Sequence, residues 1–292
     1  MSHAATQSYV VNFLHRIDFV FKFMSNIKNI VLFGQMNPWL GSIVSFMTLY
    51  CLSLLYTLYR YFIKKTKTQY KDKHVFITGG STGLGLSLAQ KLYKRGANIT
   101  IVARNEERLQ KVTSEIKKDD CGKIQYFSAD MTNPDTKDIE KLIEKAETDF
   151  GPIDFLFCNA GYSLPETFLE SDLSCFEKQM DLNYYGYVKM SHPVAKSMAE
   201  RKSGTIVYVS SVLGIFGIPG YGGYCPSKYA VKALADSVEL ELKPYNVNVH
   251  LYAPGTIDTP GYQEENKMKP DLAKKIEGTA SFVSICLFYI KI

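Results

Sequence analysis

The sequence lacks the residue clusters that mark metal, redox and disulfide chemistry. Its six cysteines are scattered without a CxxC pair, and its five histidines form no HExxH group. Scattered cysteines are typical of free thiols in a reducing compartment, whereas metal ligands usually occur at short, regular spacings. The sequence therefore predicts neither a disulfide-stapled domain nor a metal enzyme.

A strong excess of charge is also lacking. The chain has 34 Lys and Arg against 29 Asp and Glu, a net charge of +5, and several of the positive charges are lysines within residues 64–73. A nucleic-acid-binding protein usually carries a basic face across its fold, so we expect no nucleic-acid partner. With 46% apolar and 22% charged residues, the composition is typical of a packed globular protein.

Charged residues are missing from one long stretch, residues 29–59. The overlapping segment from Trp39 to Ile63 holds about 25 residues with a single charge, Arg60, and a helix of that length can cross a hydrocarbon core about 30 Å thick. A buried core helix is the alternative, but such helices rarely run so far without a charge. We therefore predict a transmembrane helix over residues 37–63.

The flanks of this span predict its orientation. Arg60 and the lysines of residues 64–73 outnumber the three basic residues before the span, so the chain after it is expected in the cytosol. Residues 1–36 form an extension whose apolar periodicity fits an amphipathic helix on a membrane surface or, equally, an unstructured segment. Residues 64–72 form a basic linker, and residues 73–292 form the main domain.

In the main domain, short apolar runs alternate with longer amphipathic stretches. The runs expected to form strands are His74–Thr78, Asn98–Ala103, Lys123–Ala129, Ile153–Cys158, Thr205–Ser210 and Asn248–Ala253. The stretches expected to form helices are Leu84–Arg95, Glu106–Lys118, Asp135–Phe150, Asp172–Arg201 and Tyr224–Pro244. This alternation predicts an α/β fold with a doubly wound parallel sheet of the Rossmann type.

A glycine-rich turn joins the first expected strand to the first expected helix, where the chain reads TGGSTGLG from Thr78 to Gly85. Glycines at this place permit a tight turn and bring backbone N–H groups close to a pyrophosphate at the helix N-terminus. The position between strand and helix makes the motif informative. The residues expected to bind a dinucleotide here are Gly79, Ser81, Thr82, Gly83, Leu84 and Gly85.

The residue after the second expected strand predicts which dinucleotide binds. An acidic residue near this point usually binds the ribose 2′-hydroxyl of NAD, whereas an arginine accommodates the 2′-phosphate of NADP. Here the strand ends in Ala103 and Arg104. Arg104 can make a planar, paired contact with phosphate oxygens, and Arg108, four residues further along an expected helix, would lie on the same face. The sequence therefore favours NADPH.

A tyrosine and a lysine at a four-residue step open the helix after the fifth expected strand. Tyr224 and Lys228 should share one helical face, and Pro226 restricts the pair to the first turn. A nearby ammonium favours the phenolate and lowers the pKa of Tyr224 from its usual value of about 10. Ser210 and Ser211 end the fifth strand at the same edge of the sheet, where a hydroxyl could hold a carbonyl oxygen.

In their order along the chain, these motifs resemble those of the short-chain dehydrogenase/reductase family. The resemblance covers roughly residues 73–260, and its parts are the TGxxxGxG turn, Asn159-Ala160-Gly161, Asn183, the two serines, the YxxxK motif and Pro254-Gly255. YxxxK alone would occur by chance in many proteins, but the whole set is specific.

The resemblance implies a role for each of these residues. Tyr224 would be the general acid of a carbonyl reduction, and Lys228 would bind the nicotinamide ribose and lower the pKa of Tyr224. Ser211 would orient the substrate carbonyl, with Ser210 as the second candidate. Asn183 would hold a water of the proton relay, and Asp130 would contact the adenine. Asn159 would line the cofactor cleft, and Ile257 would line the nicotinamide side.

A later stretch, Thr259 to Pro270, reads TPGYQEENKMKP and resembles a loop of the 3-ketodihydrosphingosine reductases within that family. This resemblance implies reduction of a long-chain sphingoid ketone at the cytosolic face of the endoplasmic reticulum membrane. Glu264 and Glu265 could meet the amine of such a substrate, or they are ordinary surface charges. A membrane anchor suits a substrate that resides in the bilayer.

Other functions stay open at this stage. After Glu277 the chain reads GTASFVSICLFYIKI, where the family continues further, and we expect a shortened domain with an open sheet edge and an incomplete substrate lid. The alternatives are a membrane-anchored reductase of very-long-chain 3-ketoacyl thioesters or steroids, and an inactive protein that binds NADPH. The long helices expected at Asp172–Arg201 and Tyr224–Pro244 resemble those that pair subunits in this family, so a homo-oligomer is a further expectation.

Overall fold

The computed structural model describes residues 46–56, 70–133 and 135–277. The chain divides into two units, Met1–Thr68 and Gln69–Ile292. In the first unit, residues 46–56 are helical with exposed side chains. None of the helices in the described ranges is long and apolar enough to cross a membrane. The rest of the span at residues 37–63, the extension 1–36, most of the linker 64–72 and residues 278–292 lie outside these ranges, so the transmembrane helix stays a prediction.

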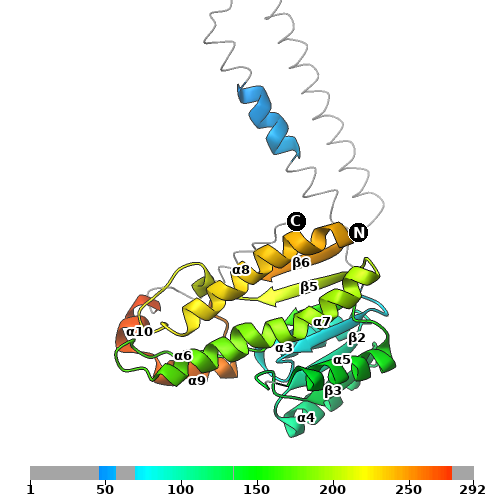
Figure 1. The fold of residues 1–292 in the computed structure, drawn as a ribbon, viewed down its shortest axis with the longest axis horizontal. Helices are drawn as coiled ribbons and strands as arrows, with labels where there is room; N and C mark the ends of the chain where they lie inside the picture. The colour runs from blue at the N-terminus through cyan, green and yellow to red at the C-terminus, as the bar shows by residue number, and fades with distance from the viewer. Residues whose placement is uncertain (1–45, 57–69, 134, 278–292) are drawn as a thin grey trace, which may run out of the picture. The chain divides into compact units, whose positions relative to one another are not determined.

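The second unit contains a six-stranded parallel sheet (Figure 1). The strands are β1 (His74–Thr78), β2 (Asn98–Ala103), β3 (Lys123–Ser128), β4 (Phe155–Cys158), β5 (Gly204–Val209) and β6 (Val247–Tyr252). They lie in the order β3-β2-β1-β4-β5-β6, and every neighbouring pair is parallel. The order reverses between β1 and β4, which is where doubly wound folds bind their ligands. The predicted fold class is confirmed for this unit.

Helices cover both faces of the sheet because alternate strand residues point to opposite sides. Phe76 packs into one core with α5 (Thr136–Phe150), α7 (Gly186–Glu200) and α8 (Tyr224–Leu242). Its strand neighbours Val75 and Ile77 pack into a second core with α3 (Gly83–Tyr93) and α4 (Glu106–Lys117). All five residues of β1 are buried, as a central strand covered on both faces requires.

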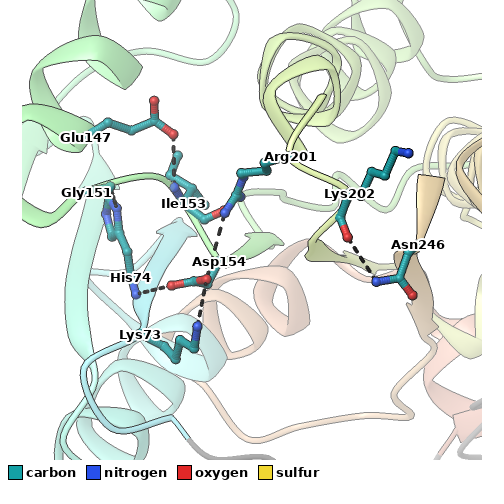
Figure 2. A network of polar contacts seen from close by, with 9 residues as sticks. All are labelled: Lys73, His74, Glu147, Gly151, Ile153, Asp154, Arg201, Lys202 and Asn246. Atoms are coloured by element: carbon teal, nitrogen blue, oxygen red, sulfur yellow. Dashed lines mark hydrogen bonds and ion pairs between the residues drawn. The ribbon is translucent and has the colours of Figure 1, made fainter. Parts of the chain in front are cut away.

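The amino edge of the sheet is tied together by charged side chains around Asp154 (Figure 2). Its carboxylate accepts a hydrogen bond of 3.0 Å from the backbone N–H of His74 and forms ion pairs with Lys73 at 3.2 Å and Arg201 at 3.8 Å. Arg201 also donates to the backbone oxygen of Ile153. These contacts hold the starts of β1 and β4 against the end of α7. The opposite, carboxyl edge is where the residues singled out in the sequence gather.

The predicted strands and helices are found within one or two residues of their expected ends, with one exception. The expected helix Asp172–Arg201 is divided into α6 (Leu173–Met180), a π-helical turn (Asp181–Tyr185) and α7. Side-chain bonds of Asn183, which lies in this turn, hold it to neighbouring segments, and single-turn π-helices often occur at functional sites.

Two helices beyond β6, α9 (Pro260–Met268) and α10 (Asp271–Glu277), were not predicted. Thr259 caps α9 by accepting a hydrogen bond from the N–H of Tyr262 at 3.1 Å, and proline occupies the first helical position. This Thr-Pro pair is a helix-start signal in the sequence that the prediction did not use.

Candidate active site

The glycine turn between β1 and α3 has the shape that a pyrophosphate-binding loop requires. Gly79 and Gly83 have φ angles of +68° and +54°, a conformation that glycine adopts without strain. A Cβ atom on Gly85 would overlap the carbonyl oxygen of Gly79 and lie 2.7 Å from the Asn159 amide nitrogen. The turn therefore packs so closely that side chains are excluded at these glycines.

Asn159 and Thr78 lock this turn against the end of β4. The Thr78 hydroxyl oxygen accepts hydrogen bonds from the backbone N–H groups of Asn159 at 2.9 Å and Ala160 at 3.1 Å. The Asn159 side-chain amide donates to the carbonyl oxygens of Thr78 at 3.0 Å and Gly79 at 3.3 Å. Asn159 was expected to line the cofactor cleft, and in the structure its side chain shapes the turn itself.

The N-terminus of α3 is suited to an anion. Thr82, the residue before the helix, is extended, and among the described residues its side chain makes no capping hydrogen bond. The first turn of α3 contains no acidic residue. The first backbone N–H groups of a helix lack partners within the helix and, with the helix dipole, attract negative charge. The turn and the helix start together fit the pyrophosphate of a dinucleotide.

The two arginines expected to distinguish NADP from NAD lie after the end of β2. Arg104 is exposed directly after β2, and Arg108 is exposed in the first turn of α4. Asn105 caps that helix by accepting from the N–H of Arg108 at 2.7 Å, so Arg104 precedes the helix. The expectation that the two arginines share one helical face is therefore wrong, although both follow β2.

Asp130, two residues after β3, has its carboxylate held in a local turn. Desolvation acts to raise the pKa of Asp130, but hydrogen bonds from the Thr132 N–H and hydroxyl, with the charges of Arg104 and Lys189, lower it below its usual value. Asp130 is therefore an ionised hydrogen-bond acceptor at neutral pH, close enough to Arg104 to feel its charge. An acceptor at this point can bind the amino group of an adenine.

Tyr224, Ser211 and Lys228 come together at the carboxyl edge. The Ser211 hydroxyl lies close enough to the Tyr224 phenol to lower its pKa. Lys228 is 96% buried, and its ammonium donates to the carbonyl oxygen of Val209 at 3.0 Å and lies 5.8 Å from the centre of the Tyr224 ring. The prediction that these three side chains are neighbours agrees with this geometry.

The pKa values at this site differ from the expectation. Desolvation raises the pKa of the Tyr224 phenol well above its usual value; the nearby Ser211 hydroxyl lowers it, and the charge of Glu265 raises it further. Desolvation also lowers the pKa of the Lys228 ammonium to about 7. We expected Lys228 to lower the Tyr224 pKa, but in this structure the Tyr224 pKa is raised. The reason is that desolvation outweighs the lowering effect of the Ser211 hydroxyl.

Ser210, the second candidate for the carbonyl contact, has a different environment. Its side chain is buried, and its hydroxyl donates to the backbone carbonyl oxygen of Lys228 at 3.0 Å. A Cβ atom on Gly214 would lie 2.5 Å from that hydroxyl, so the surroundings are closely packed. Ser210 therefore fastens α8 to the end of β5, while Ser211 faces Tyr224.

Asn183 lies behind the tyrosine and lysine and is completely buried. Its side-chain oxygen accepts from the N–H of Tyr162 at 3.0 Å, and its amide donates to the Tyr162 carbonyl oxygen and the Ser227 hydroxyl, each at 3.0 Å. The side chain thus joins the π-helical turn to the loop after β4 and to α8. Asn183 holds these parts of the site together, and its side-chain atoms already have partners in the protein.

The loop after β6 brings Ile257 to the same edge. Ile257 is partly exposed, two residues before the α9 cap Thr259. A Cβ atom on Gly83 would lie 3.0 Å from the Thr259 methyl group, so this loop packs directly on the glycine turn. Its position is consistent with the expected contact on the nicotinamide side.

Three residues at this edge were missed or left undecided by the sequence analysis. Tyr221 donates from its hydroxyl to Glu265 at 2.5 Å, and the Lys269 ammonium lies 3.6 Å from the same carboxylate oxygen. Tyr221 and Lys269 are buried. The four-residue step from Glu265 to Lys269 could have indicated a pair, but the sequence does not show that Tyr221 lies between them and Tyr224.

Comparisons with known proteins agree with this fold and site. Residues 73–270 match the family model described as short chain dehydrogenase. The NAD+-bound xylitol dehydrogenase has a similar structure, with a TM-score of 0.66 and 26% identity over 73% of this chain and 86% of that chain. Levodione reductase has a TM-score of 0.66 and 29% identity over 70% of this chain and 80% of that one. The chain therefore belongs to the short chain dehydrogenase family.

Its curated relatives define a narrower group within that family. The 3-ketodihydrosphingosine reductase of Mus musculus is 42% identical over 71% of this chain and 63% of that protein. The 3-dehydrosphinganine reductase of Danio rerio is 41% identical over 71% of this chain and 63% of that protein. The Dictyostelium discoideum 3-ketodihydrosphingosine reductase is 36% identical over 76% of this chain and 71% of that protein. The chain thus spans about two thirds of the length of these relatives, and its resemblance to the 3-ketodihydrosphingosine reductases is confirmed.

Proposed function

We propose that this protein is an NADPH-dependent reductase that converts 3-ketodihydrosphingosine into dihydrosphingosine in sphingolipid synthesis. The observation that carries the proposal is the buried Lys228 ammonium 5.8 Å from the centre of the Tyr224 ring, with the Ser211 hydroxyl close to the same phenol. A glycine turn that fits a pyrophosphate lies at the same edge of the sheet. Relatives that bear the name of this reductase support the choice of substrate.

The chain's own residues supply the groups that a carbonyl reduction needs. A bound nicotinamide would supply the hydride for the carbonyl carbon. Tyr224 would donate its hydroxyl proton to the carbonyl oxygen, and Ser211 would hold that oxygen by a hydrogen bond. The raised pKa of Tyr224 keeps the phenol protonated at neutral pH, as a general acid must be. Lys228 would bind the nicotinamide ribose, and Asn183 would position the relay that returns the proton.

The other cofactor contacts in the proposal follow the sheet edge. The turn residues from Gly79 to Gly85 would bind the pyrophosphate, Asp130 would bind the adenine, and Ile257 would lie against the nicotinamide. Asn159 would keep the turn open for the phosphates. Arg104, with Arg108 nearby after β2, would bind the 2′-phosphate that distinguishes NADPH from NADH.

We expect Arg104→Ala to weaken NADPH binding by about 10- to 100-fold and NADH binding by less than about threefold, because only NADPH carries the 2′-phosphate. Cofactor titration of each variant by fluorescence measures both affinities. Arg95→Ala is a matched control, since Arg95 precedes β2 at the amino edge and stacks on Tyr70. An equal loss for both cofactors would contradict the role of Arg104.

The setting of the enzyme is part of the proposal. A sphingoid ketone resides in the bilayer, so an anchor at residues 37–63 would hold the site beside its substrate. The resemblance to 3-ketodihydrosphingosine reductases suggests the endoplasmic reticulum membrane as its location. The basic residues that follow the span suggest that the reductase domain is in the cytosol. We also expect the protein to form a homo-oligomer in which α7 and α8 pair the subunits.

The substrate assay compares purified, detergent-solubilised protein on three kinds of ketone. We expect kcat/KM for 3-ketodihydrosphingosine to exceed that for a steroid ketone or a very-long-chain 3-ketoacyl thioester by about 100-fold or more, because polar recognition discriminates strongly. Oxidation of NADPH at 340 nm measures all three rates. Faster turnover of either rival ketone would assign the same site to that substrate instead.

A further inference from the structure

α9 carries two adjacent glutamates to the edge of the sheet where the candidate active site lies. Its capping residue Thr259 packs on Gly83 in the glycine turn, so the helix starts next to the proposed cofactor position. Glu264 and Glu265 follow in its second turn. Neighbouring residues on a helix point in directions about 100° apart, so only one of the two can face the site.

The structure distinguishes clearly between the two glutamates. The Glu264 side chain is 68% exposed and forms an ion pair with the exposed Lys267 at 2.7 Å. The Glu265 side chain is only 20% exposed and accepts the 2.5 Å hydrogen bond from the Tyr221 hydroxyl. Glu264 is therefore an ordinary surface charge, and Glu265 is turned towards the protein.

Tyr221 links Glu265 to the reacting tyrosine. Its ring is 99% buried and packs edge-on against the Tyr224 ring, with 6.0 Å between the ring centres. The carbonyl oxygen of Tyr221 also accepts a hydrogen bond of 2.9 Å from the N–H of Cys225 at the start of α8. The Glu265 carboxylate is thus one tyrosine ring away from Tyr224, and its charge raises the Tyr224 pKa.

The charge of Glu265 is balanced by a lysine at a longer distance. The Lys269 ammonium lies 3.6 Å from the carboxylate, beyond the range of a good hydrogen bond, and its side chain is only 1% exposed. It also lies 4.7 Å from the centre of the Tyr262 ring, which adds a cation–π contact. The partly buried Glu265 carboxylate is therefore only partly neutralised by Lys269, one tyrosine ring away from Tyr224.

The proposed substrate needs an anion close to this place. Its amino group is on the carbon next to the ketone, so the ammonium nitrogen lies about 3 Å from the carbonyl oxygen, as ordinary bond lengths require. When Tyr224 donates to that oxygen, the ammonium enters the same partly desolvated space. A cation there is unfavourable unless a carboxylate accepts its hydrogen bonds.

We infer that Glu265 is a specificity-determining residue that binds the ammonium group of the sphingoid ketone, with Tyr221 holding its carboxylate in place. The inference rests on the proposed function, because it assigns to this site a substrate with an amine beside its ketone. It predicts that the enzyme prefers an amino ketone to a plain ketone of the same length.

The test compares 3-ketodihydrosphingosine with a ketone of equal chain length that lacks the amine. In Glu265→Gln we expect kcat/KM for the amino ketone to fall by about 10- to 100-fold, mainly through KM, because a charged hydrogen bond is lost. Turnover of the plain ketone should change by less than about threefold, because it makes no such bond and desolvation, the largest cause, still keeps the Tyr224 pKa raised without this charge. Glu264→Gln is the matched control and should behave like the wild type with both ketones.

Two further results decide against the inference in different ways. An equal loss for both ketones in Glu265→Gln and in Tyr221→Phe would mean that the Tyr221–Glu265 bond only holds α9 in place. A wild type that reduces the plain ketone but not the amino ketone would refute the proposed function. The role of Glu265 would then be refuted as well, because it depends on that function. Selective loss in Glu265→Gln, with Glu264→Gln unaffected, supports both.

Discussion

Replacing Tyr224 with phenylalanine should lower the rate of ketone reduction by about 1,000-fold or more while leaving NADPH affinity within about twofold of the wild type. The substitution removes the phenol hydroxyl and keeps the ring, which packs against Tyr221. The proton donor is lost, but the glycine turn that would bind the cofactor is untouched. NADPH oxidation in the presence of 3-ketodihydrosphingosine, together with cofactor titration, measures the two effects separately.

The control for this variant is Tyr245→Phe. Tyr245 is an exposed tyrosine in the short 3-10 turn after α8, remote in sequence from the start of that helix, and its substitution should leave turnover unchanged. Cofactor binding with no tyrosine-dependent turnover in the wild type would favour the alternative that the chain binds NADPH without catalysing a reaction. Equal rates in wild type and Tyr224→Phe would remove Tyr224 from the mechanism.

The second large effect is expected from Gly85→Ala, which should weaken cofactor binding by about 100-fold or more. A methyl group at this position would overlap the carbonyl oxygen of Gly79 and crowd the Asn159 amide that holds the turn. The turn would have to open, and its backbone N–H groups would no longer converge on the pyrophosphate. Equilibrium titration with NADPH measures the loss directly.

Gly217→Ala is the matched control, because a Cβ atom at Gly217 would meet nothing within 4 Å among the described residues. Thermal unfolding of the cofactor-free variants separates a local effect on the turn from general destabilisation. If Gly85→Ala bound NADPH as tightly as the control, the turn would not be the pyrophosphate site.

Most of the fold could be predicted from the sequence because its signals are local. β1 and β2 were recognised from short apolar runs, and their ends agree with the structure to the residue. The glycine turn was recognised because it stands between a strand and a helix, where φ angles such as that of Gly79 are needed. Strand–helix alternation then left few topologies for a parallel sheet.

Features that depend on contacts between distant segments were missed. The π-helical turn at Asn183 arises where this side chain bonds to Tyr162 and Ser227, and the periodicity of residues 172–201 gives no sign of it. The lowered pKa of Lys228 and the raised pKa of Tyr224 result from desolvation by surrounding elements. The sequence placed an ammonium beside a phenol correctly but contained no measure of how deeply both are buried.

By itself, the sequence determined the order of the strands and helices and the residue types that follow each strand, because local periodicity and turn chemistry set these. Only the tertiary structure distinguished Glu264 from Glu265 on α9, two glutamates that the sequence left equal: the first is exposed and the second is turned towards Tyr221. For the two serines at the end of β5, it showed that Ser210 bonds to the backbone of α8. The reason is that neighbouring side chains on one element point in different directions, and the packing of that element against the rest of the fold sets which of them faces the protein.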